Sequence, residues 1–295
     1  WSAPVMLFEG DHQISDPVVV ADASGGVNVF WAYGESSELD TIYFTRWDGK
    51  AWSEPVDIIA STVASFPSAT VDPRGRLHMI CYGQGAQLYY TSARVDEAAS
   101  APGWDKPYAI HQANGHAQIV ADGEGRLHLA YPAPGKEGDY YTMSEDGVDW
   151  SWPLQIALVS QPDVAADWAR IAVGSDGTLY VVWTEFELPN GWPPVGVFFS
   201  SSSDDGLTWS LPVEIAGPGY DQIGVLASAE GVVHVAWNGM VGVSGRYHRW
   251  SVSGGQTWSG ITTLTSSGAT EGVPQLAVDS AGTVYLLTTA DGCVW

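Results

Sequence analysis

The sequence predicts an all-β protein, a six-bladed β-propeller in which each blade holds four antiparallel strands. Two phrases recur six times, in phase, at intervals of about 50 residues. The first is an alternating apolar run behind a glycine turn, as in "GTLYVVW", and its glycines are Gly25, Gly75, Gly125, Gly177, Gly231 and Gly282. The second begins at a tryptophan, as in "WSLPV", and its copies start at Trp1, Trp52, Trp104, Trp150, Trp209 and Trp258. Six copies of each phrase indicate a repeat architecture.

The elements of one repeat follow from the spacing of its apolar residues. They alternate with a period of two, which predicts short strands, and no segment carries the pattern of a long helix. Two strands flank the glycine turn, a third follows, and the tryptophan phrase leads into the fourth. Four antiparallel strands in about 50 residues are typical of a propeller blade.

The repeats predict a single domain over residues 1–295. Its blades are expected at 11–60, 61–112, 113–158, 159–216, 217–264, and 265–295 together with 1–10. The last repeat stops within its third strand, whereas Trp1 opens with the fourth-strand phrase. We therefore expect the N-terminal strand to complete the last blade and leave no open edge.

Composition limits the classes of partner. Lys and Arg number 11 against 34 Asp and Glu, so the formal net charge is −23, and nucleic acid and anionic membranes are poor partners. No run approaches the roughly 20 apolar residues of a membrane helix, so no membrane insertion is expected. Abundant Trp, Tyr and Gly with scarce Lys suit an extracellular or cell-surface protein. Because the chain begins at Trp1, we expect a processed form or one domain of a larger parent protein.

Cysteine and metal chemistry are not expected. Cys81 and Cys293 fall in blades that are not adjacent, so we predict two unpaired thiols, with Cys81 buried. No spacing resembles a zinc, redox or calcium motif, and no metal or cofactor is expected. His78, His128 and His234 share one register in separate blades, which favours a repeated structural position over metal ligation.

The turn before the fourth strand resembles a known motif. Residues 202–209 read S-S-D-D-G-L-T-W and match S-x-D-x-G-x-T-W at every defined position. Blade five has Ser253 and blade three has Glu145 where the aspartate belongs. In these turns the chain resembles the Asp-box (BNR-repeat) propellers of the sialidase-like superfamily. The resemblance implies that the boxes are folding devices on the face opposite the ligand site.

The same resemblance allows a test for sialidase chemistry. For a sialidase of this family, the resemblance implies three arginines that bind the substrate carboxylate, a Tyr–Glu pair that supplies the nucleophile and an Asp that acts as the acid. Of eight arginines, we expect only Arg170 and Arg246 to reach the ligand face, with Arg249 ambiguous. "SDPVV" at Ser15 stands where the family has F/Y-R-I-P. No arginine triad can be assembled, so a true sialidase is disfavoured.

The expected site lies at the axial mouth, displaced toward blade four, which has the longest loops on the ligand face. Aromatic rings there could stack on sugar rings, although they could equally be core between blades. The candidates for ligand binding are His116, Gln118, Asp167, Trp168, Arg170, Glu185 and Trp192. The candidates for catalysis, which in glycoside hydrolysis needs paired carboxylates, are Asp16, Asp167 and Glu185.

Three functions remain open at this point. The first is recognition of neutral glycans without catalysis, and it is favoured because the sialidase residues are missing. The second is a glycoside hydrolase acting on a sugar other than sialic acid through paired carboxylates. The third is a structural or protein-interaction propeller.

Overall fold

The computed structural model describes residues 3–35, 38–135, 137–189, 193–227, 231–240, 242, 244–265, 273–278, 283–287, 289–290 and 293–294. Contacts divide the chain into two compact units. The first unit comprises Trp1–Ala113, Ala117–Leu127 and Met143–Trp150, and the second comprises Asn114–His116, His128–Thr142 and Ser151–Trp295. Among the described residues, no helix combines the length and the apolar character needed to cross a membrane.

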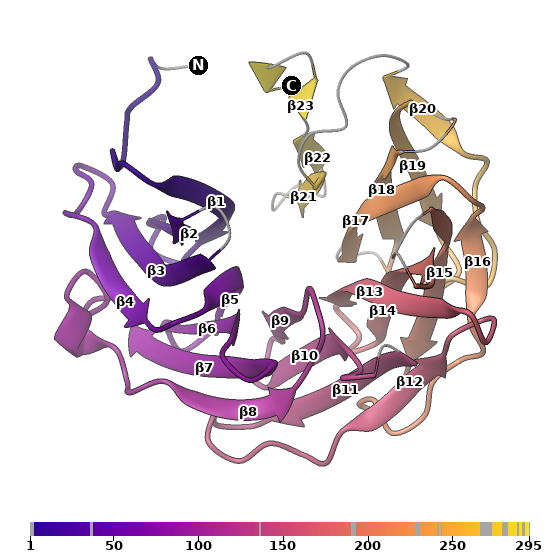
Figure 1. The fold of residues 1–295 in the computed structure, drawn as a ribbon, viewed down its shortest axis with the longest axis horizontal. Helices are drawn as coiled ribbons and strands as arrows, with labels where there is room; N and C mark the ends of the chain where they lie inside the picture. The colour runs from indigo at the N-terminus through magenta and orange to yellow at the C-terminus, as the bar shows by residue number, and fades with distance from the viewer. Residues whose placement is uncertain are drawn as a thin grey trace. The chain divides into compact units, whose positions relative to one another are not determined.

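Five four-stranded antiparallel sheets follow one another along the described chain, each with its strands side by side in chain order (Figure 1). The first holds β1 (Gln13–Ala21), β2 (Val27–Glu35), β3 (Glu38–Trp47) and β4 (Val56–Ala60). The second holds β5 (Ala64–Val71), β6 (Arg76–Gly83), β7 (Gln87–Arg94) and β8 (Tyr108–Gln112), with the 3-10 helix η1 (Ala101–Gly103) before β8. The third holds β9 (Gln118–Ala121), β10 (Leu127–Pro132), β11 (Gly138–Ser144) and β12 (Leu154–Leu158).

The fourth sheet holds β13 (Val164–Val173), β14 (Leu179–Glu187), β15 (Pro194–Ser202) and β16 (Val213–Ala216). The fifth holds β17 (Tyr220–Ala227), β18 (Val233–Gly239), β19 (Gly245–Ser251) and β20 (Thr262–Thr265). In the sixth repeat, β21 (Gln275–Val278) pairs with β22 (Val284–Leu287), and β23 (Thr289–Ala290) pairs with β24 (Cys293–Val294). The all-β class and the four strands per repeat are thus confirmed in five repeats.

The N-terminal segment departs from the expectation. Residues 3–10 form no strand, so the predicted closing strand is absent there, and Trp1 lies outside the described residues. Phe8 instead packs on three rings of the first sheet, with centroid distances of 5.3, 5.3 and 4.9 Å to Trp31, Tyr33 and Tyr43. Aromatic pairs at such distances are favourable, which accounts for the segment lying on the first sheet.

One tryptophan contact recurs between successive sheets. The tryptophan of the second phrase packs edge-on against an aromatic ring of the preceding sheet in four repeats. The pairs, with centroid distances, are Trp104–Phe44 at 5.3 Å, Trp150–Tyr90 at 5.5 Å, Trp209–Tyr141 at 5.4 Å and Trp258–Phe199 at 5.0 Å. These four tryptophans therefore pack between successive sheets.

In the fourth and fifth sheets the glycine three residues before the tryptophan allows the approach. A Cβ at Gly206 would lie 2.1 Å from Cε1 of Tyr141, and one at Gly255 would lie 2.0 Å from Cε1 of Phe199. Both glycines have positive φ, +81° and +90°. Any other residue would meet an aromatic ring and a strained backbone together.

The same rings hold the recurring histidines. Nδ1 of His78 lies 2.7 Å from the hydroxyl of Tyr90, and Nδ1 of His128 lies 2.7 Å from that of Tyr141. In the fifth sheet, Nδ1 of His234 lies 3.1 Å from Nε2 of His248. These histidines therefore occupy one repeated structural position, as their register suggested.

The turn at residues 202–209 yields a stability prediction. The Asp204 carboxylate accepts hydrogen bonds from the Thr208 N–H, the Thr208 hydroxyl and the Ser202 hydroxyl at 2.9, 2.6 and 2.8 Å. In the fifth sheet Ser253 meets Thr257 in the same way, at 2.9 Å to its N–H and 2.8 Å to its hydroxyl. We predict that Asp204→Ala lowers the melting temperature by a few degrees and that Ser253→Asp raises it, since a carboxylate strengthens such bonds.

Differential scanning calorimetry of the two variants tests this pairing. A Ser253→Asp protein that melts below the wild type would show that the fifth turn cannot accommodate the aspartate, and would contradict the equivalence of the two turns.

Cys81 yields a second prediction. It is a free thiol buried in β6, and burial raises its pKa to about 12. Because only the thiolate reacts quickly, native protein should leave Cys81 unmodified by iodoacetamide, whereas protein in urea should be modified fully. Mass spectrometry of tryptic peptides gives the readout, and a linked Cys81–Cys293 peptide without reduction would contradict both the labelling pattern and the strand placement.

Candidate functional site

Four first strands share an irregularity at one position. The pairing of the first strand with the second shifts register between Ser15 and Val18, Ser65 and Ser68, Asp167 and Arg170, and Asp221 and Gly224. In three of these bulges a residue other than glycine has positive φ: Asp16 at +52°, Phe66 at +51° and Trp168 at +61°. Such residues cost about 1–3 kcal/mol each and cluster at functional sites. The bulges are therefore the first place to look for a site.

The bulge at Trp168 is held by the carboxylate that precedes it. Oδ1 of Asp167 accepts a hydrogen bond from the N–H of Trp168 at 2.7 Å and from the N–H of His116 at 2.9 Å, and it lies 3.3 Å from Nδ1 of His116. Burial acts to raise the pKa of Asp167, but these hydrogen bonds and the His116 ring outweigh it and lower the pKa below its usual value of 3.8. Asp167 is therefore an ionised carboxylate at neutral pH.

Gly115 makes this arrangement possible. A Cβ there would lie 2.2 Å from Oδ1 of Asp167, and the residue has φ of +108°. Only glycine lets the backbone before His116 pass this close to the carboxylate.

The ring of Trp168 lies among two further side chains. The His116 ring stacks on it with a centroid distance of 3.5 Å and an interplanar angle of 9°, and Cζ of Arg170 lies 5.1 Å from its centroid. His116, Asp167, Trp168 and Arg170 are all partly exposed. We call these four residues the Trp168 platform.

Trp168 and Arg170 are two residues apart in β13, and strict alternation along a strand would place them on one side. The register shift, however, lies between Asp167 and Arg170. The bulge, with the positive φ of Trp168, sets their directions instead.

Glu185 lies in β14, opposite Ala166 of β13, and is 1% exposed. Its carboxylate accepts two bonds from the Ser160 N–H, at 3.1 and 3.0 Å, one from the Ser160 hydroxyl at 2.5 Å and one from Nε1 of Trp183 at 3.3 Å. These contacts anchor the connection between β12 and β13.

Asp139 is a site residue that the sequence reasoning missed. It is 0% exposed, and neither carboxyl oxygen has a hydrogen-bond partner among the described residues. Burial, with the negative charges of Asp167 and Glu185, raises its pKa well above 3.8. A carboxyl with a raised pKa thus lies near an ionised one.

A signal for Asp139 was present in the repeats. The third strand shifts register against the fourth directly after one position, which holds Ile42, Leu88, Asp139, Val197 and Arg246 in the five sheets. Three of these residues are buried and apolar, and the two charged ones are also buried. Aligning the third strands would have marked both charged residues as exceptions.

Three further candidates are not among the four platform residues. Asp16 and Gln118 belong to the first compact unit, whereas the platform belongs to the second. Oδ2 of Asp16 is buried without a hydrogen-bond partner among the described residues. Trp192 lies outside the described residues.

Comparisons with known proteins identify the fold. A Dyadobacter fermentans protein of unknown function superposes with a TM-score of 0.70 at 14% identity, covering 95% of this chain and 91% of the other. An ulvan lyase crystallised with -[GlcA(1-4)Rha3S]- gives 0.68 at 13%, covering 97% and 81%. The NanB sialidase of Streptococcus pneumoniae gives 0.66 at 12%, covering 96% and 67%.

The chain has a sialidase-like fold. It spans 63% of a further structural neighbour, the Hadza microbial sialidase Hz136, at 14% identity and a TM-score of 0.61. No protein-family model matches the chain, and no curated protein matches it in sequence.

The buried Asp139 yields a prediction about pH. The pKa of Asp139 is raised in the folded state. The folded protein therefore keeps the full stability associated with this neutral carboxyl below about pH 3.8, and it loses that stability as the pH rises toward the folded pKa. The loss is about 1.4 kcal/mol for each pH unit in that window. Asp139→Asn keeps the shape without the ionisation, so it should match the wild type near pH 4 and exceed it at pH 7. Urea unfolding at several pH values measures this, and a variant less stable at pH 7 would contradict it.

Proposed function

We propose that this chain is a secreted or cell-surface protein that recognises neutral glycans on the Trp168 platform. The observation that carries the proposal is a partly exposed tryptophan held in a strained backbone conformation beside an ionised carboxylate. Backbone strain of this kind is retained where the surroundings enforce it, which is typical of ligand sites.

The chemistry of the platform suits a sugar. An aromatic face packs on the apolar C–H face of a pyranose, and carboxylates accept hydrogen bonds from hydroxyl groups. Oδ1 of Asp167 is occupied by protein donors, whereas no described residue donates to Oδ2. Oδ2 is therefore available to a sugar hydroxyl.

Charge favours a neutral ligand. The net charge of −23 repels polyanions from most of the surface. The guanidinium of Arg170 lies against Trp168 and donates to the carbonyl oxygen of Ala169 at 3.1 Å, so it is already engaged.

The proposal includes the larger architecture. We infer one six-bladed propeller domain over residues 1–295, with the site at its axial mouth beside the fourth sheet, acting within a larger parent protein. The four-stranded sheets and the sialidase-like fold support this arrangement.

A glycoside hydrolase is the second candidate, and Asp139 is what favours it. A carboxyl with a raised pKa beside ionised Asp167 is the kind of pairing that glycoside hydrolysis uses. Against it, Asp139 is fully buried and the oxygens of Glu185 are taken up by Ser160 and Trp183, so neither is placed to touch a sugar. Recognition is therefore the better supported function.

A matched pair of tryptophan variants tests the proposal. After a glycan array names a neutral ligand, Trp168→Ala should weaken its binding about tenfold or more in calorimetry, because buried aromatic contacts dominate affinity. Trp152 is 89% exposed in the same compact unit, so Trp152→Ala should bind as the wild type does. Trp168→Phe keeps a ring and should retain most of the affinity.

The outcomes separate the three functions. Equal affinity in the two alanine variants would remove the platform from the site, and no ligand on the array would favour a structural role. Turnover of chromogenic glycosides that Asp139→Asn abolishes without loss of binding would establish the hydrolase.

A further inference from the structure

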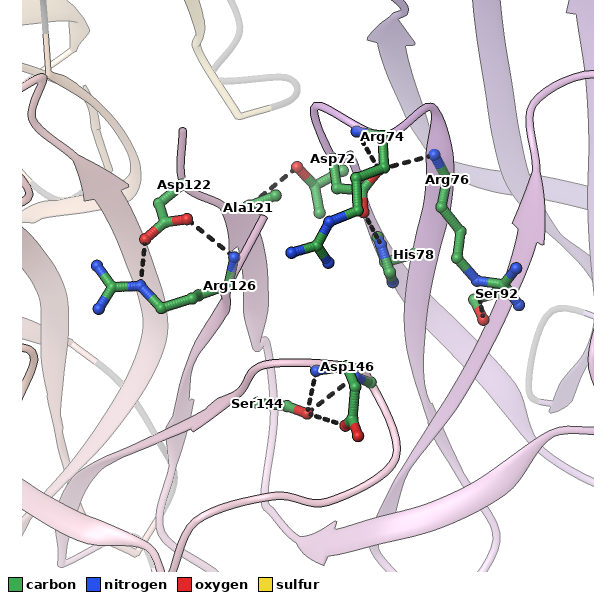
Figure 2. Close-up of polar contacts among 12 residues, drawn as sticks. Asp72, Arg74, Arg76, His78, Ser92, Ala121, Asp122, Arg126, Ser144 and Asp146 are labelled. Atoms are coloured by element: carbon green, nitrogen blue, oxygen red, sulfur yellow. Dashed lines mark hydrogen bonds and ion pairs between the residues drawn. The ribbon is translucent and has the colours of Figure 1, made fainter. Parts of the chain in front are cut away.

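A cavity lies in the first compact unit, whereas the platform belongs to the second. Its volume is about 180 Å³, and its lining residues are Asp72, Arg74, Arg76, His78, Arg94, Gly125, Glu145 and Asp146. Figure 2 shows Arg74 in the turn between β5 and β6 and Arg76 and His78 on β6, with the Arg76 guanidinium beside Ser92. Three of the chain's eight arginines thus line one small cavity in a strongly acidic protein.

The turn between β5 and β6, which holds Arg74 and leads into Arg76, is repeated in the first and third sheets with a different pairing. In each, an aspartate accepts backbone N–H bonds across the turn, as Asp72 does from Arg74 at 3.0 Å and Arg76 at 2.8 Å. In the first sheet Arg46 lies 2.8 Å from the turn residue Asp22, and in the third Arg126 lies 2.7 Å from Asp122.

In the second sheet Arg76, at the position of Arg126, pairs with Asp105 instead of the turn aspartate, and a histidine lies beside Asp72. Nε2 of His78 lies 3.5 Å from Oδ2 of Asp72. Burial lowers the pKa of His78 to about 4, so it is neutral at pH 7. Arg74 and Arg76 are therefore not used to neutralise the turn aspartate as arginines are in the neighbouring repeats.

The three guanidinium groups have weak or replaceable partners. Among the described residues, Arg74 donates only to the carbonyl oxygen of Glu124, at 3.0 Å. Arg76 pairs with Asp105 and donates to the Ser92 hydroxyl at 3.0 Å, and Arg94 donates to both oxygens of Asp96 at 3.1 and 3.2 Å. Both carboxylates are more than half exposed, and ion pairs at such positions contribute little. An entering anion can take over these donors.

The acidic lining residues oppose an anion unequally. Oδ1 of Asp72 is occupied by its own turn, and Oδ1 of Asp146 accepts the N–H groups of Val148 and Asp149 at 2.8 and 3.0 Å. Glu145 is exposed and has no such bonds among the described residues. It is the carboxylate whose removal should most strengthen anion binding.

We propose that this cavity binds a small tetrahedral oxyanion, a sulfate or phosphate group, between the guanidinium groups of Arg74, Arg76 and Arg94. Arginine donors match the oxygens of such groups in pairs, and Arg76 and Arg94 lie directly opposite each other on β6 and β7. The site is distinct from the platform and does not depend on the proposed glycan function.

Equilibrium dialysis with radiolabelled inorganic sulfate, at constant ionic strength, tests the proposal. The wild type should bind sulfate saturably, and Arg74→Gln and Arg94→Gln should each weaken binding about tenfold, the usual order for a charged hydrogen bond. Glu145→Gln should tighten it. Arg126→Gln removes the same charge from the neighbouring turn, outside the cavity, and should leave binding unchanged.

Competition distinguishes the source of the oxyanion. Displacement by methyl sulfate supports a site for sulfate esters, and displacement by inorganic phosphate alone supports a site for the free ion. Absence of saturable sulfate binding by the wild type would overturn the proposal. So would an equal loss in Arg126→Gln, because it would show an effect of overall charge.

Discussion

The second to fifth sheets are each fixed to the preceding sheet by the packing of one tryptophan on one aromatic ring. Trp209 on Tyr141 shows the full arrangement: the ring contact, the close approach of Gly206, and a hydroxyl that also meets His128. In the fourth and fifth sheets the turn that precedes the tryptophan is held by hydrogen bonds within eight residues.

A second constraint acts at the start of the first strands. The bulge there turns one residue out of the ladder, and in the fourth sheet that residue is Trp168. Asp167 holds the strained backbone through the N–H of Trp168 and also binds the N–H of His116, which lies 51 residues earlier. The Asp167 carboxylate therefore holds the strained backbone of Trp168, fixes the histidine that stacks on its ring and carries a negative charge. Such a group serves recognition because its parts are already in place before a ligand arrives.

The repeat made the strands predictable, since a period of two beside a recurring glycine is visible in the letters alone. Contacts between repeats were not visible in that way. Nothing in the sequence near Gly115 indicates that the Asp167 carboxylate lies against it. Nor does the sequence show that Phe8 packs on the first sheet, where the expected closing strand would not place it. A period of two places Trp168 and Arg170 on one side of a regular strand, but it does not show the bulge between them that sets their directions.

In a repeat protein, function is most visible where one copy departs from the pattern of the others. Asp139 occupies a position that is apolar in three of the five sheets, and burying an unpartnered carboxyl there costs stability. Arg76 pairs with Asp105, whereas Arg126 at the same position of the third sheet pairs with its own turn aspartate. Packing explains what the copies share, so it cannot explain these exceptions. A cost that a single copy bears is better explained by a role that only that copy performs, and both exceptions lie beside a candidate ligand site.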